Sequence, residues 1–277
     1  MHPAGSIFLA VAPNGARKTK SDHPRLPLSA AELADCAAAC REGGACMIHL
    51  HVRDAAGRHS LDIDAYREAT RAIRSAVGDS LVIQVTSEAV GTYTPGEQMS
   101  MVRGLKPEAV SIAVRELFSG QAPEQEVASF LTWAHAAGIV MQFILYDAAD
   151  VRSYLGLRRR GVIPSGRHWV LLVLGRYTGG VSRFEDLLPM YLAWTAEPGL
   201  SAGIPWSICA FGQREVECAA AAVTLGGHVR IGFENNMSLP DGRVARDNAE
   251  LISCFAGVAR TLGYGLATAD DMRRLFA

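Results

Sequence analysis

Two histidines separated by one residue form the most informative chemical feature of this sequence. His49 and His51 stand at the end of the apolar run 45–48. Side chains alternate between the two faces of a β-strand, so both imidazoles are expected to point the same way, with Arg53 following them if the strand continues. Two imidazoles side by side on a rigid strand offer half of a site for a divalent metal such as zinc.

A second short segment, residues 226–236, supplies candidates for the other half of that site. It reads Gly-Gly-His-Val-Arg-Ile-Gly-Phe-Glu-Asn-Asn. On a strand, Arg230, Gly232 and Glu234 would share one face, which makes Glu234 a candidate carboxylate ligand with a cation beside it. Two histidines and one carboxylate that leave a position open are typical of a catalytic zinc site. The alternative is that the histidines only fill the core and hydrogen-bond to their neighbours.

Composition and charge narrow the class of protein. The chain has 277 residues, of which 49% are apolar and 20% charged, and its formal net charge is −1. This charge gives no bulk attraction to nucleic acid or to a membrane surface. The apolar runs are too short to span a bilayer, and the first residues lack the pattern of a signal peptide. The six cysteines match no zinc or disulfide framework. We therefore expect a cytoplasmic protein with inert thiols.

Short β-rich runs alternate with helical stretches along the whole chain. The expected strands are residues 6–12, 45–52, 81–87, 109–114, 139–146, 168–174, 204–210 and 228–234. The expected helices are residues 30–42, 63–77, 96–105, 124–137, 148–160, 183–196, 213–225 and 245–262. Ser29 with Glu32 three residues later is a capping box that marks the first helix start.

This alternation predicts an α/β fold, a (β/α)8 TIM barrel, as a single domain over residues 1–277. An open doubly wound sheet is the alternative, but no Gly-x-Gly-x-x-Gly follows the first strand. In a barrel the site lies at the carboxyl ends of the strands. His49, His51 and Glu234 fall at such ends on strands that flank the first one, so they can converge. His168 and His228 fall at strand starts.

The chain resembles the β-keto acid cleavage enzyme family. Four blocks carry the resemblance: Ala-Pro-Asn-Gly-Ala at 12–16 with Thr19-Lys20, Ile-His-Leu-His-Val-Arg-Asp at 48–54, Thr-Ser-Glu-Ala-Val-Gly at 86–91, and 226–236. They lie in register with the barrel units and span nearly the whole chain. The resemblance implies an acyltransferase that converts a β-keto acid and acetyl-CoA into acetoacetate and a new acyl-CoA, and that works as a homo-oligomer, a dimer or a tetramer.

The resemblance also implies that the cofactor is Zn²⁺. The ligands would be His49, His51 and Glu234, and the metal would hold the keto acid through its oxygens as a Lewis acid. Thr86 matches the family's hydroxyl position at the end of the third strand. We expect it to donate to the oxyanion of a tetrahedral intermediate; packing or a turn hydrogen bond is the alternative.

The base that removes the substrate proton does not follow from the family pattern alone. In the family the arginine that matches Arg230 pairs with an aspartate for this role, but here the neighbour is Asn235. An arginine is a poor base unless a carboxylate shares its proton. We therefore expect Arg230 to bind or polarise substrate. Glu88 and Glu116, near the ends of the third and fourth strands, are the candidate bases; both could instead be solvated loop residues.

Several residues are candidates for substrate contacts. Arg17 stands where family members that act on an amino substrate carry a glutamate, and an arginine suits a carboxylate or a neutral polar group. We predict that the protein does not prefer 3-keto-5-aminohexanoate; simple solvent exposure of Arg17 is the alternative. Arg176 is the candidate for the CoA phosphates, because late loops often bind phosphate in these barrels. The other expected substrate-binding residues are Asn14, Ser87 and Asn235.

Two other functions fit the same metal ligands. One is a zinc-dependent hydrolase on the same barrel, although such hydrolases usually add histidines at later strand ends. The other is a non-catalytic ligand-binding relative that lost its base with the change at Asn235. Turnover that depends on acetyl-CoA would separate the acyltransferase from both.

Overall fold

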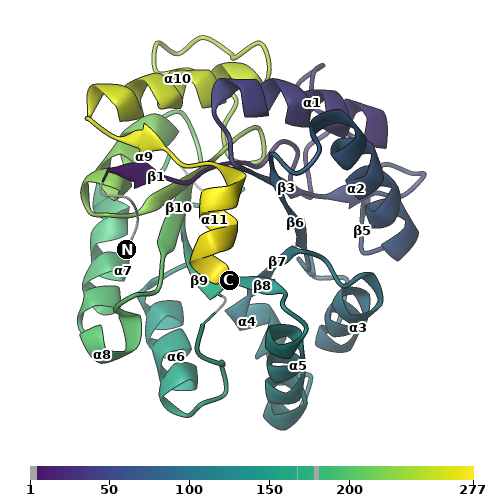
Figure 1. Cartoon of the computed structure of the whole chain (residues 1–277), viewed down its shortest axis with the longest axis vertical. Helices are drawn as coiled ribbons and strands as arrows, with labels where there is room; N and C mark the ends of the chain where they lie inside the picture. Colours follow the sequence, from purple (N-terminus) through teal and green to yellow (C-terminus); the bar gives the residue numbers. More distant parts are fainter. Residues whose placement is uncertain (1–4, 167, 178–180) are drawn as a thin grey trace.

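The computed structural model describes residues 5–166, 168–177 and 181–277 and has a closed barrel of eight parallel strands at its centre (Figure 1). In chain order the strands are β2 (Leu9–Val11), β3 (Met47–Leu50), β6 (Val82–Thr86), β7 (Ala109–Ala113), β8 (Val140–Leu145), β9 (His168–Leu174), β10 (Trp206–Ala210) and β11 (His228–Ile231). Each strand pairs with the next along the chain, and β11 pairs with β2 to close the barrel. The predicted TIM barrel is confirmed.

Helices surround the barrel as an outer ring (Figure 1). They are α1 (Ala30–Gly43), α2 (Ile63–Val77), α3 (Pro95–Leu105), α4 (Val114–Leu117), α5 (Glu124–Ala136), α6 (Ala148–Arg159), η1 (Phe184–Asp186), α7 (Leu187–Thr195), α8 (Pro198–Ser201), α9 (Glu215–Thr224) and α10 (Asn248–Thr261). Among the described residues, none of the helices is both long and apolar enough to cross a membrane.

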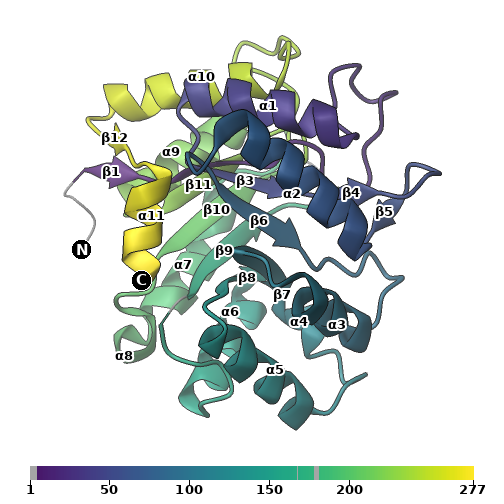
Figure 2. The ribbon, with the colours of Figure 1, turned by 45° about the vertical axis from the view of Figure 1, so that its right-hand side comes forward.

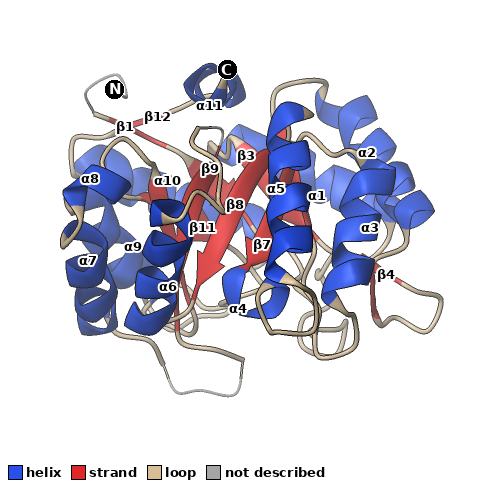
Figure 3. Ribbon diagram, turned by 90° about the horizontal axis from the view of Figure 1, so that it is seen from below, coloured by secondary structure: helices blue, strands red, loops and turns tan. Residues whose placement is uncertain are grey.

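Three smaller elements complete the chain. Strand β1 (Ser6–Ile7) pairs with β12 (Gly265–Leu266), and the last helix, α11 (Ala269–Phe276), lies across one end of the barrel (Figure 3). Strands β4 (Val52–Arg53) and β5 (His59–Ser60) form an antiparallel ribbon outside the barrel (Figure 2). The β1–β12 pair and α11 close the amino-terminal end of the barrel. The β4–β5 ribbon stands beside the opposite end.

The first helix begins and ends where its sequence indicates. The Ser29 hydroxyl accepts a hydrogen bond from the Glu32 amide at 3.3 Å, and the Ser29 amide donates to the Glu32 carboxylate at 3.0 Å, which is the predicted capping box. The helix stops at Gly44, whose φ of 113° is in the left-handed region. The positive φ favours glycine at this position, and a Cβ there would also come within 2.4 Å of the Leu266 side chain.

The interior of the barrel is polar just below the site. The inward-facing side chains of Gln84, Ser111, Gln142 and Ser207 are all buried, and the Gln142 amide donates to the Ser207 hydroxyl at 3.3 Å. Many barrels fill this level with branched apolar residues. Here the polar layer offers hydrogen-bond partners to the functional side chains above it.

The opposite end of the barrel is closed by apolar packing. Phe276 of α11 lies edge-on to Trp169 at a ring-centroid distance of 6.0 Å, and both are buried in one cluster with Phe8 and Met272. This apolar plug leaves the carboxyl end of the strands as the end of the barrel where a ligand can enter.

Candidate active site

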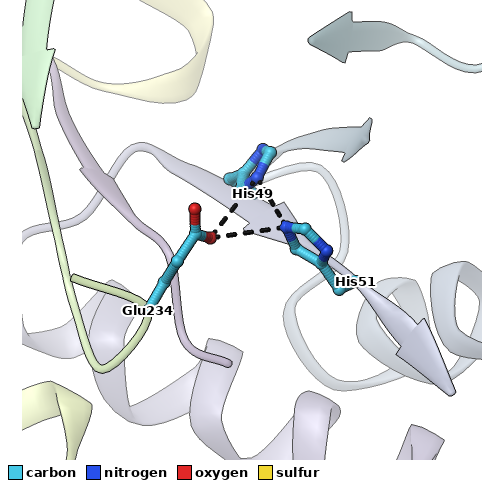
Figure 4. Close-up of side chains that lie close together, drawn as sticks. All are labelled: His49, His51 and Glu234. Carbon is cyan, nitrogen blue, oxygen red and sulfur yellow. Dashed lines mark hydrogen bonds and ion pairs between the residues drawn. The ribbon is translucent and has the colours of Figure 1, made fainter. Parts of the chain in front are cut away.

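His49, His51 and Glu234 form one buried cluster at the carboxyl end of the barrel (Figure 4). His49 lies on β3, and His51 follows the end of that strand. The two Nε2 atoms are 3.1 Å apart, and they lie 3.5 Å and 3.4 Å from the Glu234 Oε2. Atoms within 4.8 Å of one another in this way can ligate a single metal ion. The predicted convergence of these three residues is observed.

The charge states of the cluster also suit a cation. Burial lowers the pKa of His49 to about 4 and that of His51 well below its ordinary value, so both rings are neutral near pH 7. Burial alone would raise the pKa of Glu234, but Arg230 and the two histidines outweigh it and hold this pKa well below its usual range. The buried Glu234 Oε2 accepts no hydrogen bond from the residues that the structure describes. A carboxylate oxygen without a donor, facing two imidazole lone pairs, fits a metal ion.

We had expected Glu234 to lie on the last strand of the barrel. In the structure a turn brings it to the cluster. β11 ends at Ile231, and Gly232 has a φ of 147°, where the chain leaves the barrel. The Glu234 amide then donates to the Ala12 carbonyl at 3.1 Å, and the Lys18 ammonium donates to the Phe233 carbonyl at 2.6 Å. Glu234 is therefore positioned by hydrogen bonds to the loop after β2.

Replacing Gly232 with alanine is expected to lower the free energy of unfolding by about 1–3 kcal/mol and to weaken metal binding. A Cβ on Gly232 would lie 2.4 Å from the Ala12 carbonyl oxygen, so the loop that carries Glu234 must shift. Urea unfolding and zinc titration measure the two effects. Gly226→Ala is the matched control, because Gly226 also has positive φ (86°) but a Cβ there meets nothing within 4 Å. Equal zinc affinity in both variants would contradict the prediction.

Arg230 lies beside the cluster as a permanently charged partner of Glu234. Its Nη2 donates to Glu234 Oε1 at 2.8 Å and lies 3.3 Å from the Cys209 sulfur and 3.5 Å from the Asn235 side-chain oxygen. Burial would lower the pKa of Arg230, but Cys209 and Glu234 more than compensate and raise it. A guanidinium held in this way serves as a cation and an anchor, and it is not disposed to remove a proton.

A cavity of about 260 Å³ opens beside the cluster. The predicted residues that line it, besides His49 and Glu234, are Arg17, Thr86, Glu88, Glu116, Arg176 and Arg230. These residues belong to six barrel strands or to the segments that follow them, and they meet at one opening, as the barrel architecture requires.

The two candidate bases differ in how their carboxylates are engaged. Glu116 accepts hydrogen bonds from the Ala89 amide at 2.9 Å and from the Gln98 side chain at 3.0 Å, so it holds the loop after β6. Glu88 faces the cavity, with its Oε2 3.9 Å from His51 Nδ1. Burial, with help from the charges of Glu234 and Glu116, raises the pKa of Glu88 to about 8. Both residues line the cavity, but the Glu116 carboxylate is already engaged by these two hydrogen bonds.

Asn14 and Ser87, which we expect to bind substrate, are hydrogen-bonded to backbone groups. The Asn14 amide donates to the carbonyls of His51 at 2.9 Å and Pro27 at 3.0 Å, and its oxygen accepts from the His51 amide at 3.3 Å. The Ser87 hydroxyl donates to the Ser111 carbonyl at 2.9 Å. Both are buried and bonded to backbone, so Asn14 acts on the site by holding His51 in place.

Thr86 lies where its hydroxyl group can donate a hydrogen bond into the cavity. Its Oγ1 accepts hydrogen bonds from the Ser111 hydroxyl at 3.2 Å and from the Glu88 amide at 3.0 Å. Because both neighbours donate, the hydroxyl hydrogen of Thr86 is left to point elsewhere, and Thr86 lines the cavity.

Aromatic residues of the cavity were missed by the sequence reasoning. Tyr177 follows β9 and packs edge-on against Phe211 at a centroid distance of 4.9 Å, and the Arg17 guanidinium lies 5.3 Å from the Tyr177 ring. A Cβ on Gly15 would come within 2.6 Å of Glu234 and 2.7 Å of the Tyr177 hydroxyl. The glycine in the Asn-Gly pair at 14–15 was the available signal, since it indicates a close approach by other groups.

The model of the beta-keto acid cleavage enzyme family matches residues 6–277. The chain belongs to this family. It is 28% identical over 276 residues to the 3-keto-5-aminohexanoate cleavage enzyme of Fusobacterium nucleatum, which covers 98% of this chain and 97% of that protein. It is 24% identical to the 3-oxoadipate:acetyl-CoA acetyltransferase of Cupriavidus necator, with coverage of 97% and 93%. The resemblance seen in the sequence is thereby confirmed, as is the expectation of an enzyme.

The solved structure of apo ObcA resembles this family member in fold. Its TM-score is 0.71 at 16% identity, and the match covers 91% of this chain and 65% of ObcA. The chain thus spans slightly less than two thirds of the length of ObcA, and the likeness supports the barrel fold alone.

Proposed function

We propose that this chain is a zinc-dependent acyltransferase that converts a β-keto acid and acetyl-CoA into acetoacetate and a new acyl-CoA. The observation that carries the proposal is the buried cluster of His49, His51 and Glu234 beside a cavity lined with arginines. The names of relatives support it, because they include an acetyl-CoA acetyltransferase and β-keto acid cleavage enzymes.

Zinc is the metal that these ligands fit best. Two neutral imidazole nitrogens and one carboxylate oxygen, with a position left open, are the donor set of catalytic zinc sites. When bound, the metal would supply a Lewis acid that stabilises negative charge on the keto acid oxygens. Arg230 supports the same region, since its guanidinium is buried beside Glu234 and adds a fixed positive charge.

The remaining residues account for proton transfer and acyl exchange. We assign to Glu88 the removal of the proton from the substrate carbon between the ketone and the carboxylate. The Glu88 side chain faces the cavity, whereas the Glu116 carboxylate is hydrogen-bonded to the Ala89 amide. The carbanion would attack the acetyl-CoA carbonyl and release CoA thiolate. The thiolate then attacks the original ketone and breaks the bond between the ketone carbon and the carbon that was deprotonated. That carbon takes back the proton from Glu88 and leaves with the acetyl group as acetoacetate. Thr86 would donate its hydroxyl hydrogen to the oxyanions.

Arg17 and Arg176 are proposed to divide substrate and cofactor recognition. Both residues line the cavity. The Arg17 guanidinium is held over the Tyr177 ring near the cluster, so it suits an anionic group on the keto acid. Arg176 is exposed and suits a phosphate of CoA.

Replacing Arg17 with glutamate is expected to reverse substrate preference. The parent should turn over 3-oxoadipate better than 3-keto-5-aminohexanoate, and the variant should lose roughly 10- to 100-fold in kcat/KM on the dianion, since a hydrogen bond to a charged group is worth about 1.5–3 kcal/mol. Steady-state kinetics on both substrates measure this. Arg176→Gln is the comparison: it should raise the KM for acetyl-CoA and leave the preference between keto acids unchanged. A parent that prefers the amine would refute the assignment of Arg17.

Acetoacetate formation tests the proposed function directly. Zinc-loaded protein would be incubated with acetyl-CoA and with cationic, neutral and anionic β-keto acids, and acetoacetate and acyl-CoA would be quantified. The acyltransferase requires acetyl-CoA, whereas a zinc hydrolase would act without it, and a ligand-binding relative would bind zinc and keto acid without turnover. A homo-oligomeric assembly, the cytoplasmic location and a single domain over residues 1–277 stay predictions.

A further inference from the structure

In both His49 and His51, the ring nitrogen that lies away from Glu234 has a hydrogen-bond partner. Both rings present Nε2 to Glu234 (Figure 4). Behind them, His49 Nδ1 lies 2.7 Å from the Gln84 side-chain oxygen, and His51 Nδ1 lies 3.3 Å from the Nδ1 of His59. His59 belongs to none of the blocks that carry the family resemblance, and the catalytic steps above do not use it.

The contacts of His59 fix where its proton and that of His51 lie. His59 Nε2 is 3.0 Å from the Glu88 backbone carbonyl, which can only accept a hydrogen bond. Nε2 of His59 is therefore the donor, and its Nδ1 is an acceptor. The facing Nδ1 of His51 must then carry a hydrogen, which leaves the lone pair of His51 on Nε2, toward the metal ligands.

The ribbon of β4 and β5 is what brings His59 into place. In this antiparallel pair Arg53 stands opposite His59, so the chain returns to His51 after only eight residues. Asp54 sets the turn, because its carboxylate accepts from the amides of Ala56 at 2.9 Å and Arg58 at 2.8 Å. The ring of His59 is buried beside that of His51.

We propose that His59 is a positioning residue of the metal centre, which orients the His51 ring and keeps its Nε2 free to ligate. The inference rests on the proposed zinc site. Partners of this kind on metal-binding histidines typically change metal affinity by about 10- to 100-fold when they are removed. Through the Glu88 carbonyl, the same hydrogen bonds tie the metal ligand to the backbone of the proposed base.

Zinc affinity measured by competition with a chromophoric chelator tests this inference without any assay of activity. His59→Phe keeps an aromatic ring but has no nitrogen, and it should weaken zinc binding by about 10- to 100-fold. His59→Gln should restore most of the affinity, because its amide can accept from His51 and donate to the Glu88 carbonyl. The control is His228→Phe, a buried histidine at the start of β11. It should alter the melting temperature of the apo-protein and leave zinc affinity unchanged.

A direct reading of the ring protons keeps the inference testable if His59→Phe does not fold. Nitrogen NMR of the zinc-loaded parent should show His51 protonated at Nδ1 and His59 at Nε2, and the opposite pattern would overturn the inference. So would a folded His59→Phe variant that binds zinc within twofold of the parent. A parent that binds no zinc would overturn both this inference and the proposed function, whereas an unaffected His59→Phe variant leaves the proposed function standing.

Discussion

Replacing Glu234 with glutamine is expected to remove zinc and to lower turnover by roughly a thousandfold or more. Lewis-acid stabilisation of a developing oxyanion contributes several kcal/mol, and each step of about 1.4 kcal/mol is tenfold in rate. Glu234 is the single carboxylate of the three-residue cluster, and its Oε2 faces both histidine nitrogens at 3.4–3.5 Å. An amide in its place would keep the size of the side chain but present no negative charge to the metal.

The same substitution should also destabilise the metal-free protein, because Arg230 would lose its buried counter-ion. Removing one partner of a buried ion pair costs about 3–5 kcal/mol, and the Arg230–Glu234 pair is almost fully buried. Zinc content after dialysis, turnover and urea unfolding of the apo-protein measure the three effects. Glu234→Asp is the matched control: it keeps the charge, so it should retain more stability than Glu234→Gln. A folded Glu234→Gln variant with full zinc content would exclude Glu234 as a ligand.

The part of the site that could be predicted from sequence is the part that follows from strand geometry. His49 and His51 converge because side chains alternate on a strand and parallel strands end at one edge. The capping box at Ser29 and Glu32 could also be predicted, because its hydrogen bonds join residues that are only three apart in the chain. In both cases the partners are fixed by backbone geometry within a few residues.

The rest depends on contacts between segments that are far apart in the chain. Glu234 was assigned correctly to the cluster but for a reason that was wrong in detail, since a turn at Gly232 and a bond to Ala12 place it. Asn14 was expected to touch substrate, yet its amide is taken up by the backbone of His51, 37 residues away. No periodicity reports such pairings, because they form only once the loops have packed.

Residues missed by the sequence reasoning share this origin. His59 is brought to His51 by a ribbon outside the barrel, and Tyr177 meets Gly15 across the barrel opening. A lone histidine on a two-residue strand, or a lone tyrosine in a loop, carries no spacing signal of its own. The glycine at position 15 is the exception, since a residue without a side chain beside a conspicuous motif indicates that other groups come close.

Replacing Glu88 with glutamine is expected to lower turnover by about 10²- to 10⁴-fold while zinc stays bound, which is the range for loss of a positioned proton-transfer group. Its carboxylate faces the cavity, whereas Glu116 is bonded to Ala89 and Gln98. Glu116→Gln, the matched control, should cost less, through a looser Ala89 loop. In the absence of acetyl-CoA, NMR can monitor the exchange of the substrate's acidic hydrogens for deuterium. This exchange isolates the proton removal that is assigned to Glu88.

The pH dependence of the parent gives a second reading of the same role. Burial raises the pKa of Glu88 to about 8, and a carboxyl accepts a proton only in its ionised form. The kcat/KM is therefore expected to rise with pH until Glu88 is ionised. A nearby dication would lower the pKa of Glu88, so the rise would then end below pH 8. Glu88→Gln should lose this rise together with most of its activity. Full turnover and unchanged deuterium exchange in Glu88→Gln would show instead that the proton goes to another group.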